Sequence, residues 1–215
     1  MAKQEGIIKY RLNYSSAPEL DADQLLEINS WRDVLYARHL IGQDPDRYGG
    51  YGYGNISQRL PPFDAPAHQR RFVISGTQTG DLAKLSASHY CVVLECDPDR
   101  NLIEAAGPIR PSSESLTHGT LYDLDNSLRF VMHVHSPEIW RRGLSLGLPV
   151  TEEKVPYGSP EMAEEVRRLF RDTDVNERHI FSMGGHEDGI VSFGRSAGEA
   201  GASLLATLEQ ARKDR

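Results

Sequence analysis

The sequence predicts a single domain of the mixed α/β or α+β class. Strand-like and helix-like segments are mixed along the whole chain, and no stretch between them has the composition of a linker. The 215 residues are 39% hydrophobic and 26% charged, which is typical of a globular domain that buries its core without disulfides. We therefore treat residues 1–215 as one domain, with residues 1–20 as an N-terminal extension.

The first half of the chain predicts one helix followed by several strands. Residues 6–14, GIIKYRLNY, favour an extra strand within the N-terminal extension. Asp21-Ala-Asp-Gln24 has the pattern of a capping box, and the apolar residues after it recur at helical spacing, which predicts a helix over residues 21–41. The glycine-rich GGYGYGNISQRL predicts a loop that enters a strand. Further strands are expected at residues 70–77, 89–96 and 100–107.

The second half predicts helices that begin with recognisable caps. A helix is expected over residues 114–124 and a strand over RFVMHVH, residues 129–135. Ser136-Pro137-Glu138 favours a helix start, because serine caps, proline suits the first helical position and glutamate favours the positive end of the dipole. The remaining expected elements are a helix after Ser159-Pro160-Glu161, short strands at HIFSM and GIVSFG, and a last helix opened by the capping box Ser196-Ala-Gly-Glu199.

Charge and the N-terminal sequence exclude some classes of partner. The net charge of −7 argues against a nucleic-acid partner, which requires a basic surface, although an acidic protein can still hold a locally positive site. The N-terminal MAKQEGIIKYRLNY has no apolar stretch long enough for a signal peptide or a membrane span. We therefore expect a cytoplasmic protein without a membrane partner.

The two cysteines, Cys91 and Cys96, match no zinc or redox motif. On a regular strand their separation of five residues places them on opposite faces. We expect both to be small buried hydrophobic residues.

Two histidines, His133 and His135, lie two residues apart at the end of a predicted strand. Their imidazoles therefore face the same side, which suits two nitrogen ligands of one metal. An ordinary surface or core role is the alternative for such a pair. A metal site needs further groups, and the sequence offers Glu114 in RPSSESLTH and His186 in MGGHEDGIVSFG.

Other segments extend this pattern in order along the chain: GNIS at 54–57, SGTQTG at 75–80, RPSSE at 110–114, HVH, and a later histidine before the final strand. Together they resemble the class II aldolase/adducin family, which includes L-fuculose- and L-rhamnulose-phosphate aldolases, ribulose-phosphate 4-epimerases and methylthioribulose-phosphate dehydratases. The resemblance implies a three-layer α/β/α fold with a mixed, largely antiparallel central sheet. It also implies a homotetramer with active sites at subunit interfaces.

The resemblance implies one divalent metal per chain, usually zinc, held by His133, His135 and His186. It makes Glu114 the catalytic acid/base. Cleaving a carbon–carbon bond beside a ketone leaves an enediolate, which a metal stabilises as a Lewis acid while a carboxylate moves the proton. The alternative for Glu114 is a carboxylate that only stabilises a helix N-terminus.

The resemblance also implies that a set of residues binds a substrate phosphate: Asn55, Thr79, Gly80, Ser112 and Ser113. Hydroxyls, an amide and backbone N–H groups suit phosphate without net positive charge. Each of these residues could instead serve a turn or a cap, most of all the two serines before a helix. His118 lies one helical turn after Glu114, and we expect it to be a packed residue near the site or a surface residue. Tyr157 stands where many members carry a tyrosine.

The chain departs from the family pattern at two places. Many members carry His-Gly directly before the last strand, whereas Gly-His186-Glu-Asp188-Gly stands here. We favour His186 as the ligand because zinc prefers imidazole, with Asp188 as the alternative. The loop SGTQTG is longer than the common Thr-x-x-Gly, which leaves Thr79 or Thr77 in the substrate role and leaves phosphate recognition open.

The prediction for function is a metal-dependent lyase of the class II aldolase type that cleaves a small hydroxy-ketone or sugar phosphate. A dehydratase, epimerase or decarboxylase using the same site is the alternative, as is a non-catalytic adducin-like scaffold, which would lack the metal set. A cupin also uses H-x-H, but here the spacing to Glu138 and Gly143 is short and Pro137 begins a helix. An amidohydrolase barrel requires a longer chain.

Overall fold

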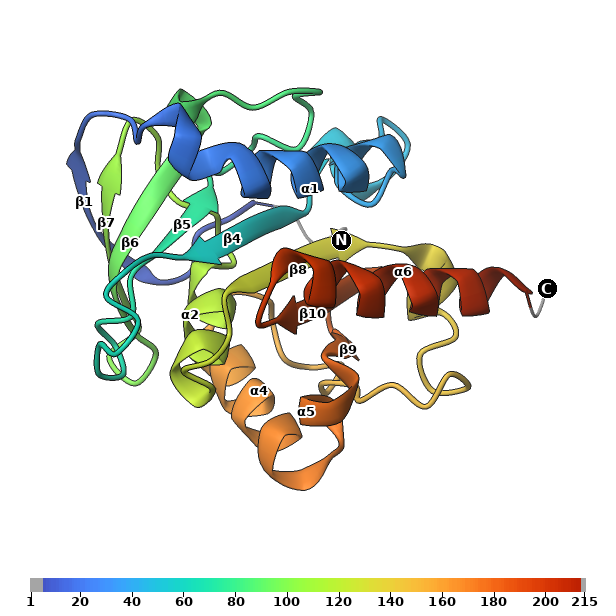
Figure 1. Cartoon of the computed structure of the whole chain (residues 1–215). Helices are drawn as coiled ribbons and strands as arrows, with labels where there is room; N and C mark the ends of the chain where they lie inside the picture. Colours follow the sequence, from blue (N-terminus) through green and yellow to red (C-terminus); the bar gives the residue numbers. More distant parts are fainter. Residues whose placement is uncertain (1–5, 214–215) are drawn as a thin grey trace.

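An eight-stranded sheet runs through the computed structural model, which describes residues 6–213 (Figure 1). The strand order is β1-β7-β6-β5-β4-β8-β10-β9, and among these neighbours only β1 and β7 are parallel. The sheet is therefore mixed and largely antiparallel, as predicted. Its strands are β1 (Arg11–Ser16), β4 (Asn55–Arg59), β5 (Phe72–Ser75), β6 (Tyr90–Asp97), β7 (Leu102–Gly107), β8 (Phe130–His135), β9 (Ile180–Ser182) and β10 (Gly189–Gly194). A separate hairpin pairs β2 (Gly42–Gln43) with β3 (Gly52–Tyr53).

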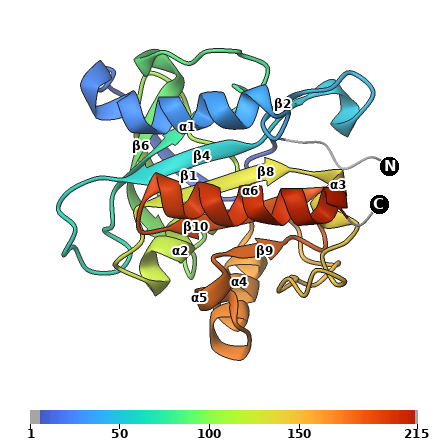
Figure 2. The same ribbon diagram turned by 45° about the vertical axis from the view of Figure 1, so that its right-hand side comes forward.

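Helices cover both faces of the sheet, which confirms the three-layer prediction. Figures 1 and 2 show α1 and α6 on one face and α2, α4 and α5 on the other. The helices are α1 (Leu26–Ala37), α2 (Ser115–Leu124), α3 (Pro137–Trp140), α4 (Pro160–Asp172), α5 (Val175–Arg178) and α6 (Ala197–Lys213). Among them, none is long and apolar enough to cross a bilayer.

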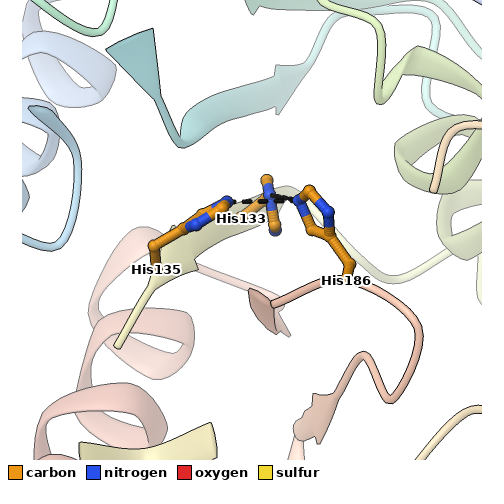
Figure 3. A group of neighbouring side chains, drawn as sticks. All are labelled: His133, His135 and His186. Atoms are coloured by element: carbon orange, nitrogen blue, oxygen red, sulfur yellow. Dashed lines mark hydrogen bonds between the residues drawn. The ribbon is translucent and has the colours of Figure 1, made fainter. Parts of the chain in front are cut away.

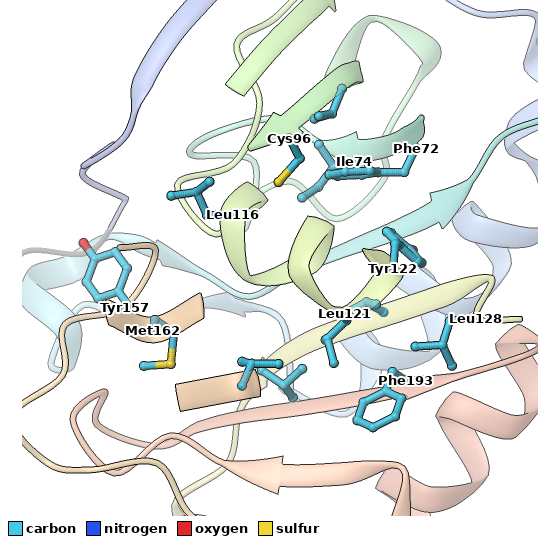
Figure 4. Close-up of a cluster of buried hydrophobic side chains, with 14 of the residues drawn as sticks. Phe72, Ile74, Cys96, Leu116, Leu121, Tyr122, Leu128, Tyr157, Met162 and Phe193 are labelled. Atoms are coloured by element: carbon cyan, nitrogen blue, oxygen red, sulfur yellow. The ribbon is translucent and has the colours of Figure 1, made fainter. Parts of the chain in front are cut away.

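Strand β8 separates two parts of the hydrophobic core and determines the face on which its histidines lie. Every residue of FVMHVH is buried, and alternate side chains enter different clusters. Met132 and Val134 pack with α1 and α6, whereas Val131 belongs to the cluster on the α2 and α4 side. Figure 4 shows part of this second cluster. Because side chains alternate along a strand, His133 and His135 share the face of Val131.

The first predicted helix is shorter than expected. A 3₁₀ turn, Ala22–Leu25, precedes α1, and Asp21 makes no side-chain cap, so the predicted capping box is wrong. The helix ends at Ala37 because His39 adopts a left-handed conformation with φ 57°. The His39 and Leu40 N–H groups then donate to carbonyls of the last helical turn, an arrangement that closes a helix.

Both cysteines are buried and free, as predicted, but their expected placement on opposite faces is wrong. Strand β6 contains a bulge between Val93 and Glu95, where it pairs with β7. The extra residue reverses the alternation, so Cys91 and Cys96 join the same hydrophobic cluster. Figure 4 labels Cys96 in this cluster.

Strand β1 begins later than predicted. It spans residues 11–16 and adds a parallel edge strand beside β7, so the N-terminal extension does supply an extra strand. Residues 7–10, which were expected to belong to it, instead reach the segments that hold Tyr157 and Ser112.

Candidate active site

Three buried imidazoles meet at the end of β8 (Figure 3). His133 and His135 come from the strand, and His186 comes from the loop between β9 and β10. The Nε2 atom of His186 lies 3.2 Å from that of His135 and 3.3 Å from that of His133. The structure therefore brings together the three histidines that the sequence singled out.

Two glycines, Gly184 and Gly185, allow the loop to deliver His186. A Cβ on Gly184 would collide with the Thr151 carbonyl, and one on Gly185 would lie 2.6 Å from the Glu153 carbonyl. The backbone can therefore approach the 151–155 segment only without side chains at these positions.

The geometry and protonation of this cluster fit a divalent metal. Burial lowers the pKa of His133 to about 4, against a smaller opposing effect of the Ile190 backbone, and burial also lowers the pKa of His135 well below its ordinary value. The imidazoles of His133 and His135 are therefore neutral at neutral pH, which is the form that binds metals. Two nitrogens bound to one tetrahedral zinc ion at 2.0–2.1 Å lie about 3.3 Å apart, which matches the observed separations.

Asp188 lies beside this cluster and outside it. Its carboxylate accepts a hydrogen bond from the Tyr48 hydroxyl at 2.7 Å and forms an ion pair with Arg47. The Tyr48 ring in turn meets His135 edge-on, with centroids 4.5 Å apart. The structure thus places His186 rather than Asp188 among the clustered nitrogens. Arg47 and Tyr48 carry no sequence signal, because their partner is some 140 residues away.

Glu114 lies at the start of α2 with 2% of its surface exposed. Its Oε2 accepts a hydrogen bond from the Thr117 hydroxyl at 3.0 Å, and its Oε1 has no hydrogen-bond partner among the described residues. Burial raises the pKa of Glu114 to about 7, against opposing effects of Thr117 and of the positive charge on Lys9. The carboxylate makes no cap hydrogen bond to the helix N-terminus, so the geometry does not favour the helix-capping alternative. A carboxyl group with a pKa near neutrality suits proton transfer.

The predicted substrate residues surround one small cavity of about 20 Å³. Its walls include both Glu114 and His133 together with these predicted residues: Asn55, Thr79, Gly80, Ser112 and Ser113. Thr77 also lines the cavity, while the Thr79 hydroxyl donates to the Gly76 carbonyl at 2.8 Å. The buried Oδ1 of Asn55 has no partner among the described residues, which leaves it available to a bound group.

Arg32 holds the 79–83 loop through hydrogen bonds, a role that was not predicted from the sequence. Its buried guanidinium donates to the carbonyls of Thr79, Gly80 and Ala83 at 3.1, 3.3 and 3.0 Å. The signal was available in α1, where an arginine occupies a position in the apolar stripe that contains Ile28 and Leu35.

His118 is packed inside the protein and is not a surface residue. Its Nδ1 lies 2.7 Å from the Ser57 hydroxyl, which is 2.8 Å from the Tyr122 hydroxyl. Burial, aided by His133, lowers the pKa of His118, so it is neutral. His118 thus supports the strand and helix that hold the site.

Tyr157 borders the cluster and anchors the N-terminal extension. Its ring centroid lies 4.5 Å from that of His186. The Ile7 N–H donates to the Tyr157 hydroxyl at 3.2 Å, and the Lys9 ammonium donates to the Tyr157 carbonyl at 2.9 Å. Residues before β1 therefore reach the site, which local sequence patterns could not predict.

Comparison with known families matches residues 45–213 to the Class II Aldolase and Adducin N-terminal domain. The chain belongs to the class II aldolase and adducin family. Its fold is similar to L-fuculose-1-phosphate aldolase from Thermus thermophilus, with TM-score 0.62 and 19% identity over 89% of this chain and 92% of that one. It is also similar to YgbL from Klebsiella pneumoniae, with TM-score 0.64 and 20% identity over 90% and 89%. No curated protein matches the chain by sequence.

A third solved structure of this family fold is the sugar-phosphate aldolase from Thermotoga maritima, with TM-score 0.58 and 17% identity over 88% of this chain and 92% of that one. At these sequence identities, the similarity to these solved structures shows a shared fold and does not show a shared activity. The activity of this family member therefore depends on the residues of its own site.

Proposed function

We propose that this class II aldolase family member is a metal-dependent lyase that cleaves a carbon–carbon bond in a small hydroxy-ketone or sugar phosphate. The observation that carries the proposal is that a buried carboxyl group and one of three converging imidazoles line the same cavity. His133 and Glu114 both line it, and His135 and His186 lie against His133.

In this proposal His133, His135 and His186 hold one divalent metal, with zinc as the expected ion. Three nitrogen ligands leave a position open for substrate, as catalytic zinc sites do. The metal supplies Lewis-acid stabilisation of the negative charge that develops when the bond beside a ketone breaks.

Glu114 moves the proton in this scheme. Thr117 fixes one carboxylate oxygen, and the other is left to accept a proton from the substrate hydroxyl. The same carboxyl group then returns a proton to the ketone fragment, so no net proton is gained or lost. Asn55, Thr79, Gly80, Ser112 and Ser113 bind a terminal phosphate through an amide, hydroxyls and backbone N–H groups.

Metal analysis tests the proposal. The purified protein should contain about one zinc or similar ion per chain, and His135→Ala should lose both the metal and the activity. Glu114→Gln should keep the metal and lose turnover of ketose phosphates in a retro-aldol assay. Full metal occupancy in His135→Ala would overturn the ligand assignment, and absence of metal after reconstitution would instead favour the adducin-like scaffold.

Dehydration, epimerisation and decarboxylation are the second candidate, because they need the same negative charge stabilised beside a carbonyl. YgbL, for which aldolase, epimerase and decarboxylase activities have been suggested, has the same fold. The substrate screen therefore follows loss of the ketose as well as release of aldehyde. We also propose that the protein is a cytoplasmic homotetramer. Light scattering of the purified protein would test the oligomeric state.

A further inference from the structure

A second and much larger cavity, of about 530 Å³, also borders the histidine cluster. His135 forms part of its wall, just as His133 forms part of the wall of the small cavity. Five arginines from four parts of the chain also line it: Arg38, Arg47, the adjacent Arg141 and Arg142, and Arg212.

The charges around this large cavity are not balanced. Glu138 is the one carboxylate in the described part of its wall, and it pairs with Arg212 at 3.1 Å. Asp188, close by, pairs with Arg47. Arg38 and Arg141, both exposed, form no ion pair with any described residue, and Arg38 donates only to the backbone carbonyl of its own helix at Val34. A concentration of positive charge in a chain of net charge −7 indicates attraction of an anion.

The two cavities restrict how a substrate can lie. The small cavity has about 20 Å³, which accommodates a compact terminal group but not a sugar chain. His133 lines the small cavity and His135 lines the large one, and their ring centroids lie 5.1 Å apart. A molecule with one end in the small cavity and its reacting carbons at the histidines must therefore extend into the large cavity.

We propose that the large cavity binds the far end of the substrate and selects an oxyanion there, so that the substrate is negatively charged at both ends. This inference rests on the proposed function, because it uses the histidine cluster as the reacting centre. Guanidinium groups bind carboxylate and phosphate oxygens through paired N–H donors, and two of the five arginines have no carboxylate partner among the described residues. Carboxylate and phosphate share this chemistry, and the test separates them.

The binding experiment uses the metal-loaded full chain with inorganic phosphate and with malonate as probes. Isothermal titration compares wild type with Arg38→Met/Arg141→Met, and with Arg171→Met as a matched control. Arg171 is an exposed arginine on α4, where it pairs with Asp172. We expect the double variant to weaken at least one probe about tenfold or more, whereas the control leaves both unchanged. The probe that is weakened more identifies the oxyanion. Equal binding by all three proteins would overturn the inference.

A kinetic arm separates this inference from the proposed function. Ketose phosphates are assayed in pairs that differ only in a neutral, carboxylate or phosphate group at the far end. The double variant should lose at least tenfold in kcat/KM on an anionic member and keep its rate on the neutral one. Equal losses on both members would overturn the inference while the lyase proposal stands. Absence of turnover on every substrate, with probe binding still dependent on Arg38 and Arg141, would overturn the lyase and retain the anion site.

Discussion

Replacing Glu114 by glutamine should make the metal-free protein more stable at alkaline pH. The pKa of this carboxyl group is about 7 in the folded chain, against an ordinary value of 4.5. Between these two values the folded chain retains a proton that the unfolded chain has released. The free energy of unfolding therefore falls as the pH rises through this window.

The expected effect is about 3 kcal/mol, since each pH unit between the two pKa values is worth about 1.4 kcal/mol. Glutamine removes the ionisation, and its carbonyl oxygen can still accept the hydrogen bond from Thr117. At pH 8 Glu114→Gln should therefore unfold about 6 to 12 °C above wild type, because 1 kcal/mol shifts the melting temperature of a chain this size by about 2 to 4 °C. Below pH 4.5 the difference should disappear.

The assay is urea and thermal unfolding at pH 4, 6 and 8 in the presence of a chelator. Glu104→Gln provides the control, because Glu104 is an exposed glutamate on β7. Equal stability of wild type and Glu114→Gln at pH 8 would refute the reasoning that burial strains this carboxylate. A stabilised variant without turnover would instead show that the site holds its acid/base group at the expense of stability.

Three further outcomes are expected. Arg32→Ala should lower stability by about 3 kcal/mol in urea unfolding and raise KM more than it lowers kcat, because it leaves three carbonyls of the substrate loop without their buried donor. Gly185→Ala should weaken zinc binding about tenfold in a chelator competition, since the new methyl group displaces the loop that carries His186; unchanged affinity would count against this account. Lys9→Met should raise the pKa of Glu114, because it removes a nearby positive charge. NMR titration of this carboxyl group in the metal-free protein should detect the upward shift.

Local patterns predicted the parts of the site that depend on local geometry. The alternation of a strand was enough to place His133 and His135 on one side, and the Ser-Pro-Glu pattern was enough to predict the start of α3, where the Ser136 hydroxyl accepts the Ile139 N–H. The convergence of His186 with this pair was expected from the family resemblance and not from spacing. The roles of these residues remain proposals that the metal and activity assays test.

Features that depend on contacts between distant segments could not be predicted in this way. The bulge that moves Cys96 to the face of Cys91 arises from the pairing of β6 with β7, and nothing in YCVVLEC indicates it. The ion pair between Arg47 and Asp188 and the approach of Lys9 to the site join residues more than 100 positions apart. Such contacts are set by the whole fold.

The N-terminal extension has a consequence for synthesis on the ribosome. Strand β1 emerges before its pairing partner, which begins with Leu102, and Ile7 must wait for Tyr157, 150 residues later. At about 5–20 residues per second this delay is roughly 8–30 s. The β1 sequence RLNYSS is mostly polar, so the nascent strand can remain in water without attracting other unpaired strands. The segment before β1 therefore joins the site only after Tyr157 has been made, and a chain released before Tyr157 is translated cannot complete the site.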